Sequence, residues 1–221
     1  MTTREDRDGV LVFGHRGRPV LVFPSAERDR YEWEQHGMVD AVRDLLDAGR
    51  LTLYCVDSWD SGTWWDEWLP LEERARRHQE YERWVLERVE GEDVITAGVS
   101  MGAYHAANLT LRHPERFPVA LCFSGVYDVG GLGWGERGDA VYFNNPADYV
   151  QGLEGSPASL LLVVGSGQWE DTTGAHAQTL RFAELLRARG IRHELDVWDE
   201  EAPHDWPAWR AQLAKHLPRF V

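Results

Sequence analysis

Short apolar runs that alternate with longer amphipathic segments are the feature that most constrains the fold. Several of these runs are apolar at consecutive positions, which is typical of strands covered on both faces of a mostly parallel sheet. Alternation of strands and helices along the whole chain predicts an α/β fold. The runs read LTLYCVD, VITAG, VALCF, LLLVVG and HELDVW, at residues 51–57, 94–98, 119–123, 160–165 and 193–198.

Two further apolar runs, VLVFG and VLVFP, lie close together near the start of the chain. Only the segment HRGRP separates residues 10–14 from residues 20–24. This spacing predicts two strands joined by a tight turn. The sheet is therefore expected to begin with an N-terminal antiparallel hairpin.

The segments between the strands are predicted to form helices that cover both faces of the sheet. Their apolar residues recur at helical spacing, and glycines follow their expected ends. In the long second helix, the charged residues 72–77 are expected to face water. A length of 221 residues suits one hydrophobic core, so residues 1–221 are expected to form a single domain. The helices are expected at 38–46, 71–91, 180–186 and 206–217.

Composition limits the partners and the compartment. A net charge of −14 would repel phosphates, which argues against nucleic acid or an anionic membrane as a partner. The chain begins with charged residues, and no apolar run approaches the roughly 20 residues of a membrane helix. Cys55 and Cys122 lie in strand-like runs and are expected to be buried free thiols. With no CxxC or HExxH motif, we expect a cytoplasmic protein without a metal site.

The segment ITAGVSMGAYHAANL holds Ser100 between two glycines, in the pattern Gly-x-Ser-x-Gly. A strand runs into this segment and a helix, 101–112, leaves it, which is the setting of a nucleophile elbow. The strained turn requires neighbours without bulk, which Gly98 and Gly102 provide. The Met101 N–H would then lie at the helix N-terminus, aimed at a developing oxyanion. The alternative is a phosphate-binding loop or a plain βα turn.

A nucleophilic serine needs a base and an acid. His204 lies in EEAPHDWPAW, between the last strand and the last helix, and follows the chain order Ser…Asp/Glu…His of this enzyme class. The acid is expected after the strand at 160–164, in GSGQWEDTT. Asp171 is the first choice and Glu170 the alternate, because only one of two adjacent side chains can point at the imidazole. The alternative for this cluster is an acidic helix cap.

The second oxyanion donor is expected in the loop after an early strand, which here reads FPSAERDRYEW. The N–H of Ala26 is the candidate, and Ser25 is the neighbouring option. The alternative is a simple βα turn with no catalytic role.

With these features together, the chain resembles the putative-esterase branch of the α/β-hydrolases, which includes the S-formylglutathione hydrolases (esterase D) and the mycolyltransferases. The chain departs from the Ser-x-Gly-Gly pattern common in that branch, because Ala103 follows Gly102. The resemblance implies a hydrolase with little or no lid, in which Ser100, His204 and either Asp171 or Glu170 act. The matching stretches are FPSA, CVDSWDSGTWWDEW, GVSMGAYHAANLTLRHPERF, LCFSGVYD and HDWPAW.

These features predict a serine hydrolase that cleaves a small-molecule carboxylic ester or thioester through an acyl-enzyme on Ser100, with no cofactor. One alternative is an acyltransferase in which an alcohol replaces water. Another is a catalytically silent hydrolase scaffold used for binding or assembly. The many aromatic residues suit either a substrate pocket or a subunit interface, so a homo-oligomer stays open.

Overall fold

The computed structural model describes residues 3–89 and 91–221. These residues form a sheet with the strand order β1-β2-β4-β3-β5-β6-β7-β8. The strands from β4 through β3 to β8 pair in parallel, and β1 and β2 run antiparallel to their neighbours. The strand bounds are β1 Arg4–Arg7, β2 Val10–Phe13, β3 Arg18–Phe23, β4 Leu51–Val56, β5 Ile95–Val99, β6 Val119–Phe123, β7 Ser159–Val164 and β8 Arg192–Val197.

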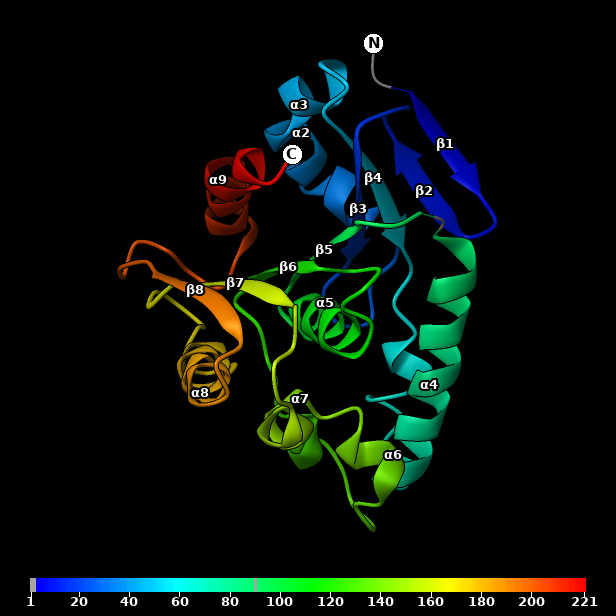
Figure 1. The fold of residues 1–221 in the computed structure, drawn as a ribbon, viewed down its shortest axis with the longest axis vertical. Helices are drawn as coiled ribbons and strands as arrows, with labels where there is room; N and C mark the ends of the chain where they lie inside the picture. Colours follow the sequence, from blue (N-terminus) through cyan, green and yellow to red (C-terminus); the bar gives the residue numbers. More distant parts are fainter. Residues whose placement is uncertain (1–2, 90) are drawn as a thin grey trace.

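Helices cover both faces of this sheet, as the sequence predicts (Figure 1). On one face lie α1 (Glu32–Gln35), α2 (Met38–Ala41), α3 (Arg43–Asp47) and α9 (Trp206–His216). On the other lie α4 (Leu71–Arg88), α5 (Met101–Arg112) and α8 (Ala175–Ala188), with α6 (Asp139–Tyr142) and α7 (Pro146–Tyr149) beyond α5. The helix expected over 38–46 is split into α2 and α3 at Val42, whose φ is −123°.

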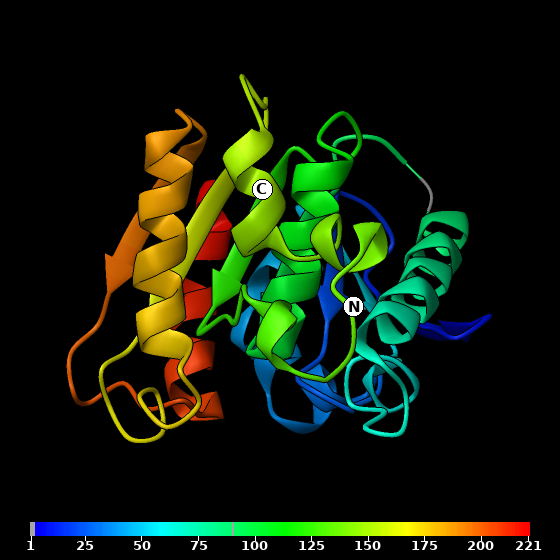
Figure 2. The ribbon, with the colours of Figure 1, turned by 90° about the horizontal axis from the view of Figure 1, so that it is seen from below.

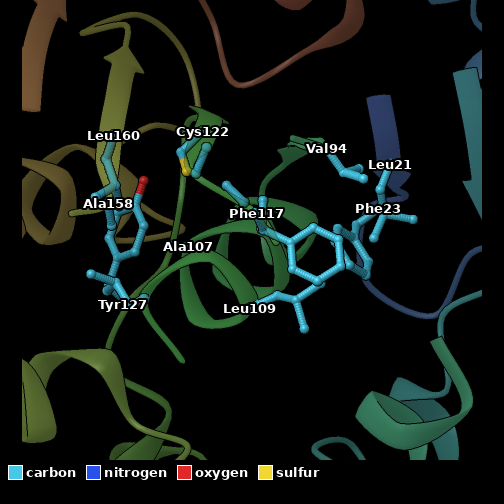
Figure 3. Close-up of a cluster of buried hydrophobic side chains, with 14 of the residues drawn as sticks. Leu21, Phe23, Val94, Ala107, Leu109, Phe117, Cys122, Tyr127, Ala158 and Leu160 are labelled. Carbon is cyan, nitrogen blue, oxygen red and sulfur yellow. The ribbon is translucent and has the colours of Figure 1, made fainter. Parts of the chain in front are cut away.

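The two faces of β2, β3, β6 and β7 contribute side chains to separate hydrophobic clusters. In β7, Leu160 and Leu162 pack with α5 and α8, whereas Leu161 and Val163 pack with α9. Figure 3 shows the first cluster, in which side chains of β3, β6 and β7 meet those of α5. Burial on both faces explains why the strand sequences are apolar at consecutive positions.

The antiparallel hairpin at the start of the sheet exists, but its strands differ from the predicted pair. The run at 10–14 contains β2, which pairs with β1 and with β4 and not with β3. Each residue of β2 is buried, so this strand needs a partner on either side. The charged and exposed sequence of β1 supplies the edge strand, and it carries no apolar pattern that could have revealed it.

Two charged residues of α4 face the protein interior, which contradicts the expectation for 72–77. The buried guanidinium of Arg74 donates to the carbonyls of Leu69 at 2.9 Å, Trp64 at 2.9 Å and Leu132 at 3.1 Å. The carboxylate of Glu72 accepts backbone N–H groups at the start of α6. Irregular loops leave such backbone groups without partners, and these side chains supply them.

Cys55 and Cys122 are buried and free, as predicted. Burial raises the pKa of both thiols, so neither is a reactive thiolate at neutral pH. Among the described residues, no helix is both long and apolar enough to cross a bilayer.

The role of Arg74 can be tested by Arg74→Met, which keeps the length of the side chain but removes its donors. We expect the free energy of unfolding in urea to fall by about 2–4 kcal/mol, because buried carbonyls lose their partners. The matched control is Arg76→Met on the same helix, whose ion pairs are 3.6 and 3.8 Å long and exposed. Its effect should stay within about 0.5 kcal/mol. Equal effects of the two changes would contradict the structural role of Arg74.

Candidate active site

The loops that follow the parallel strands gather along one edge of the sheet, which we call the carboxyl edge. In Figure 2 the arrowheads of β6 and β8 point to this edge, and the yellow and orange loops after β7 and β8 lie there. Ser100 lies at the same edge, between β5 and α5. In an open α/β sheet this edge is where ligands bind.

Ser100 has a strained backbone, with φ 54° and ψ −119°. This conformation is rare for a residue with a side chain, and it turns the serine out of the strand before the helix begins. The strand and helix around it touch so closely that side chains are excluded. A Cβ on Gly98 would lie 2.1 Å from the carbonyl oxygen of Gly102, and one on Gly102 would lie 2.3 Å from that of Pro24. Both glycines are therefore required by backbone contact.

His204 connects the serine to a buried carboxylate. Its Nε2 lies 3.0 Å from the Ser100 Oγ, and its Nδ1 lies 3.2 Å from the Glu170 Oε2. The loops that carry the histidine and the glutamate are joined by backbone hydrogen bonds. The His204 N–H donates to the carbonyl of Gln168, and the Gly167 N–H donates to that of Ala202. The loop after β7 thus fixes the place of the imidazole.

The structure pairs the imidazole with Glu170 and not with Asp171, which the sequence analysis preferred. Glu170 has no exposed surface, whereas Asp171 is exposed to solvent. The preceding Trp169 has a φ of 70°, in the left-handed region, so the chain turns immediately before the two acidic residues. The sequence QWED does not reveal this turn, because tryptophan seldom adopts a positive φ.

Sequence reasoning missed two residues that hold the glutamate. The Ser124 hydroxyl donates to the Oε1 of Glu170, and the Gly165 N–H donates to the same oxygen at 3.3 Å. The Trp209 Nε1–H donates to the Ser124 Oγ at 3.0 Å, and the indole packs edge-on against the His204 ring. An indole N–H only donates, so the serine proton is left for the carboxylate. In the sequence, the position of Trp209 in HDWPAW, close to His204, was the signal that could have indicated this contact.

The two expected oxyanion donors lie near each other. Met101 is the first residue of α5, so its N–H has no acceptor within the helix. Ala26 packs against the apolar cluster that contains Met101. The N–H of Ser25, the neighbouring option, already donates to the carboxylate of Glu32. Among residues 3–89 and 91–221, no acceptor binds the N–H of Ala26 or of Met101.

Nothing in the described ranges suggests a metal site, since no group of three His, Cys, Asp or Glu side chains there is arranged to hold an ion. The polar chemistry at the carboxyl edge is that of a serine, an imidazole, a carboxylate and free backbone N–H groups. Such a set can activate a hydroxyl oxygen and stabilise an oxyanion.

Comparison with known proteins agrees with this chemistry. The family model described as Putative esterase matches residues 78–220. The chain is 26% identical over 147 residues to the diacylglycerol acyltransferase/mycolyltransferase Ag85A of Mycobacterium gordonae. That match covers 52% of this chain and 43% of the relative, so the chain corresponds to less than half the length of that protein.

Solved structures share the fold at low sequence identity. A ferulic acid esterase is 17% identical with a TM-score of 0.68, and the match covers 100% of this chain and 96% of that one. An S-formylglutathione hydrolase from Agrobacterium tumefaciens is 16% identical with a TM-score of 0.69, over 99% of this chain and 93% of that one. The fold is that of the α/β-hydrolases, as the sequence predicts, and the chain belongs to the Putative esterase family.

Proposed function

We propose that this chain is a serine esterase in which Ser100, His204 and Glu170 form the catalytic triad. The observation that carries the proposal is the continuous chain of contacts from the serine through both ring nitrogens to the glutamate, at 3.0 and 3.2 Å. The strained backbone at Ser100 supports the same assignment, because such strain clusters at active sites. Met101 and Ala26 supply the backbone N–H groups of the oxyanion hole.

The reaction follows from these positions. His204 accepts the proton of Ser100 as the serine oxygen attacks the carbonyl carbon of the ester. The N–H groups of Met101 and Ala26 stabilise the negative charge on the carbonyl oxygen. The buried carboxylate of Glu170 stabilises the imidazolium, which then protonates the leaving alcohol or thiol. Water, activated by the same imidazole, hydrolyses the acyl-enzyme, and no cofactor takes part.

The surroundings favour a small-molecule ester or thioester as substrate. Ala26, Trp65 and Val126 are partly buried and pack against the apolar cluster that contains Met101. These side chains would offer an apolar surface to the acyl group beside the serine. A net charge of −14 and two buried free thiols favour a cytoplasmic enzyme that acts on neither nucleic acid nor membrane lipid.

The nucleophile is tested by labelling with a fluorophosphonate probe. We expect one probe per wild-type chain and none on Ser100→Ala, because the probe reacts with an activated serine hydroxyl. Hydrolysis of p-nitrophenyl acetate should fall by at least about 10³-fold in the same variant. Equal labelling of both proteins would contradict the assignment of Ser100 as the nucleophile. A wild-type chain that takes no label would indicate a catalytically silent scaffold.

The triad acid is tested by comparing Glu170→Gln with Asp171→Asn. Loss of the buried carboxylate leaves the imidazolium without its counter-charge, so we expect Glu170→Gln to lower kcat by about 10²–10⁴-fold. Asp171→Asn changes an exposed side chain and should leave kcat within about twofold. Thermal melting of both variants shows whether the fold is intact. A larger loss of kcat in Asp171→Asn would exclude Glu170 as the acid.

Acyl transfer is the second candidate, because the relative from Mycobacterium gordonae is named as an acyltransferase. In such a reaction an alcohol would replace water in the attack on the acyl-enzyme. We expect hydrolysis to dominate, so that added glycerol changes the yield of free acetate from p-nitrophenyl acetate by less than about twofold. Product analysis that finds mainly acetylated glycerol would favour the transferase.

A further inference from the structure

The loop after β3 has three consecutive backbone N–H groups that differ in their hydrogen-bond acceptors. The Ser25 N–H donates to the Glu32 carboxylate at 2.8 Å, and the Glu27 N–H donates to the Asp60 carboxylate at 3.3 Å. Between them, the Ala26 N–H has no acceptor among the described residues. The two carboxylates thus bind the N–H groups on either side of Ala26. The Ala26 N–H, which the proposed reaction needs, stays free.

Glu32 holds one side of this loop through two contacts. Besides the backbone N–H, its carboxylate accepts the Ser25 hydroxyl at 2.6 Å. Only 4% of Glu32 is exposed, and desolvation raises the pKa of its carboxyl group. Burying a carboxylate costs free energy of folding, and the hydrogen bonds between Glu32 and the loop offset that cost.

Asp60 holds the other side and also reaches α5. It lies in the 3₁₀ turn η1 (Asp60–Gly62) after β4 and has no exposed surface. One carboxylate oxygen accepts the Glu27 N–H, and the other accepts the Nε2–H of His105 at 3.0 Å. His105 lies four positions after Met101, one turn along the same helix. Asp60 thus connects the segments that carry the two oxyanion donors.

The backbone of the loop is strained where Asp60 binds it. Glu27 has a φ of 59°, a left-handed conformation that costs a residue with a side chain about 1 kcal/mol or more. Its side chain lies outside the core and is exposed. The conformation therefore persists because its surroundings hold it, and the buried carboxylate is the group that binds its N–H.

We propose that Glu32 and Asp60 are positioning residues of the oxyanion hole, which together hold the Ala26 N–H at a set distance from the Met101 N–H. This inference rests on the proposed function of Ser100. Neither carboxylate touches the reacting atoms, and both act through the loop. Their removal lets the loop relax, so that the hole loses one of its donors while the triad stays in place.

The test compares p-nitrophenyl acetate with its thiono analogue, in which sulfur replaces the carbonyl oxygen. Sulfur is larger and accepts hydrogen bonds weakly, so only the oxygen ester profits from a well-formed hole. In Asp60→Ala and Glu32→Ala, we expect kcat on the oxygen ester to fall about 10–100-fold with KM within about twofold. The ratio of oxygen-ester to thionoester kcat/KM should fall about tenfold. A loss of folded protein lowers both rates equally and leaves this ratio unchanged.

Two controls sharpen the test. Asp60→Asn keeps an oxygen for the Glu27 N–H, and its amide N–H can donate to the Nε2 of His105 once that imidazole carries its proton on Nδ1, so it should hold the ratio within about threefold of wild type. Glu82→Gln removes another buried carboxylate, which binds Arg112 and His113 at the far end of α5. We expect it to lower the melting temperature and leave the ratio unchanged.

An unchanged ratio in the folded alanine variants, or a rise in kcat when either carboxylate is removed, would overturn the positioning role. If Asp60→Ala does not fold, Glu32→Ala decides the matter by itself, because Glu32 lies on a separate short helix, α1. Turnover that survives Ser100→Ala would overturn the proposed function instead, and with it this inference. The failures of the two proposals are thus distinguishable.

Discussion

Backbone contact between β3, β5 and α5 is the constraint on which the rest of the site depends. Gly98 touches the start of α5, and Gly102 touches the end of β3, at distances that no Cβ could occupy. This contact brings the end of β3 beside the N-terminus of α5, and with it the two N–H groups of the proposed oxyanion hole. It also forces Ser100 into a positive φ, because the chain must reverse between strand and helix within one residue.

Buried carboxylates connect the loops at the carboxyl edge. Glu170 is bound by donors from the loops after β6, β7 and β8, and Asp60 by donors from the loop after β3 and from α5. A carboxylate in the interior requires several donors, so each one draws separate segments together. In this way loops of ordinary composition reach a defined geometry.

The predictable part of the fold is the part that depends on local pattern. The apolar runs that became β4, β5, β6 and β7 are buried on both faces, and this burial shows directly in their composition, whereas the edge strand β8 is mostly exposed and mixed in sequence. The partner of β2 was not predictable, because β4 comes between β2 and β3 from a distant part of the chain. Arg74 was expected in water for a related reason, since the carbonyls that it binds belong to irregular loops, and that of Leu132 is 58 residues away in sequence.

The sequence alone predicted Ser100 and His204 as the candidate nucleophile and base, because a glycine-flanked serine between strand and helix and a histidine after the last strand are local features in a defined chain order. Their contact in the structure agrees with that order. Which of the two acidic residues, Glu170 or Asp171, contacts the imidazole was decided only by tertiary structure. Both residues carry a carboxylate, so the sequence does not distinguish them. Which carboxylate is buried depends on the turn at Trp169 and on the donors Ser124 and Gly165. Ser124 follows β6, and Gly165 begins the loop that carries Glu170, so only folding brings both donors to the same carboxylate oxygen.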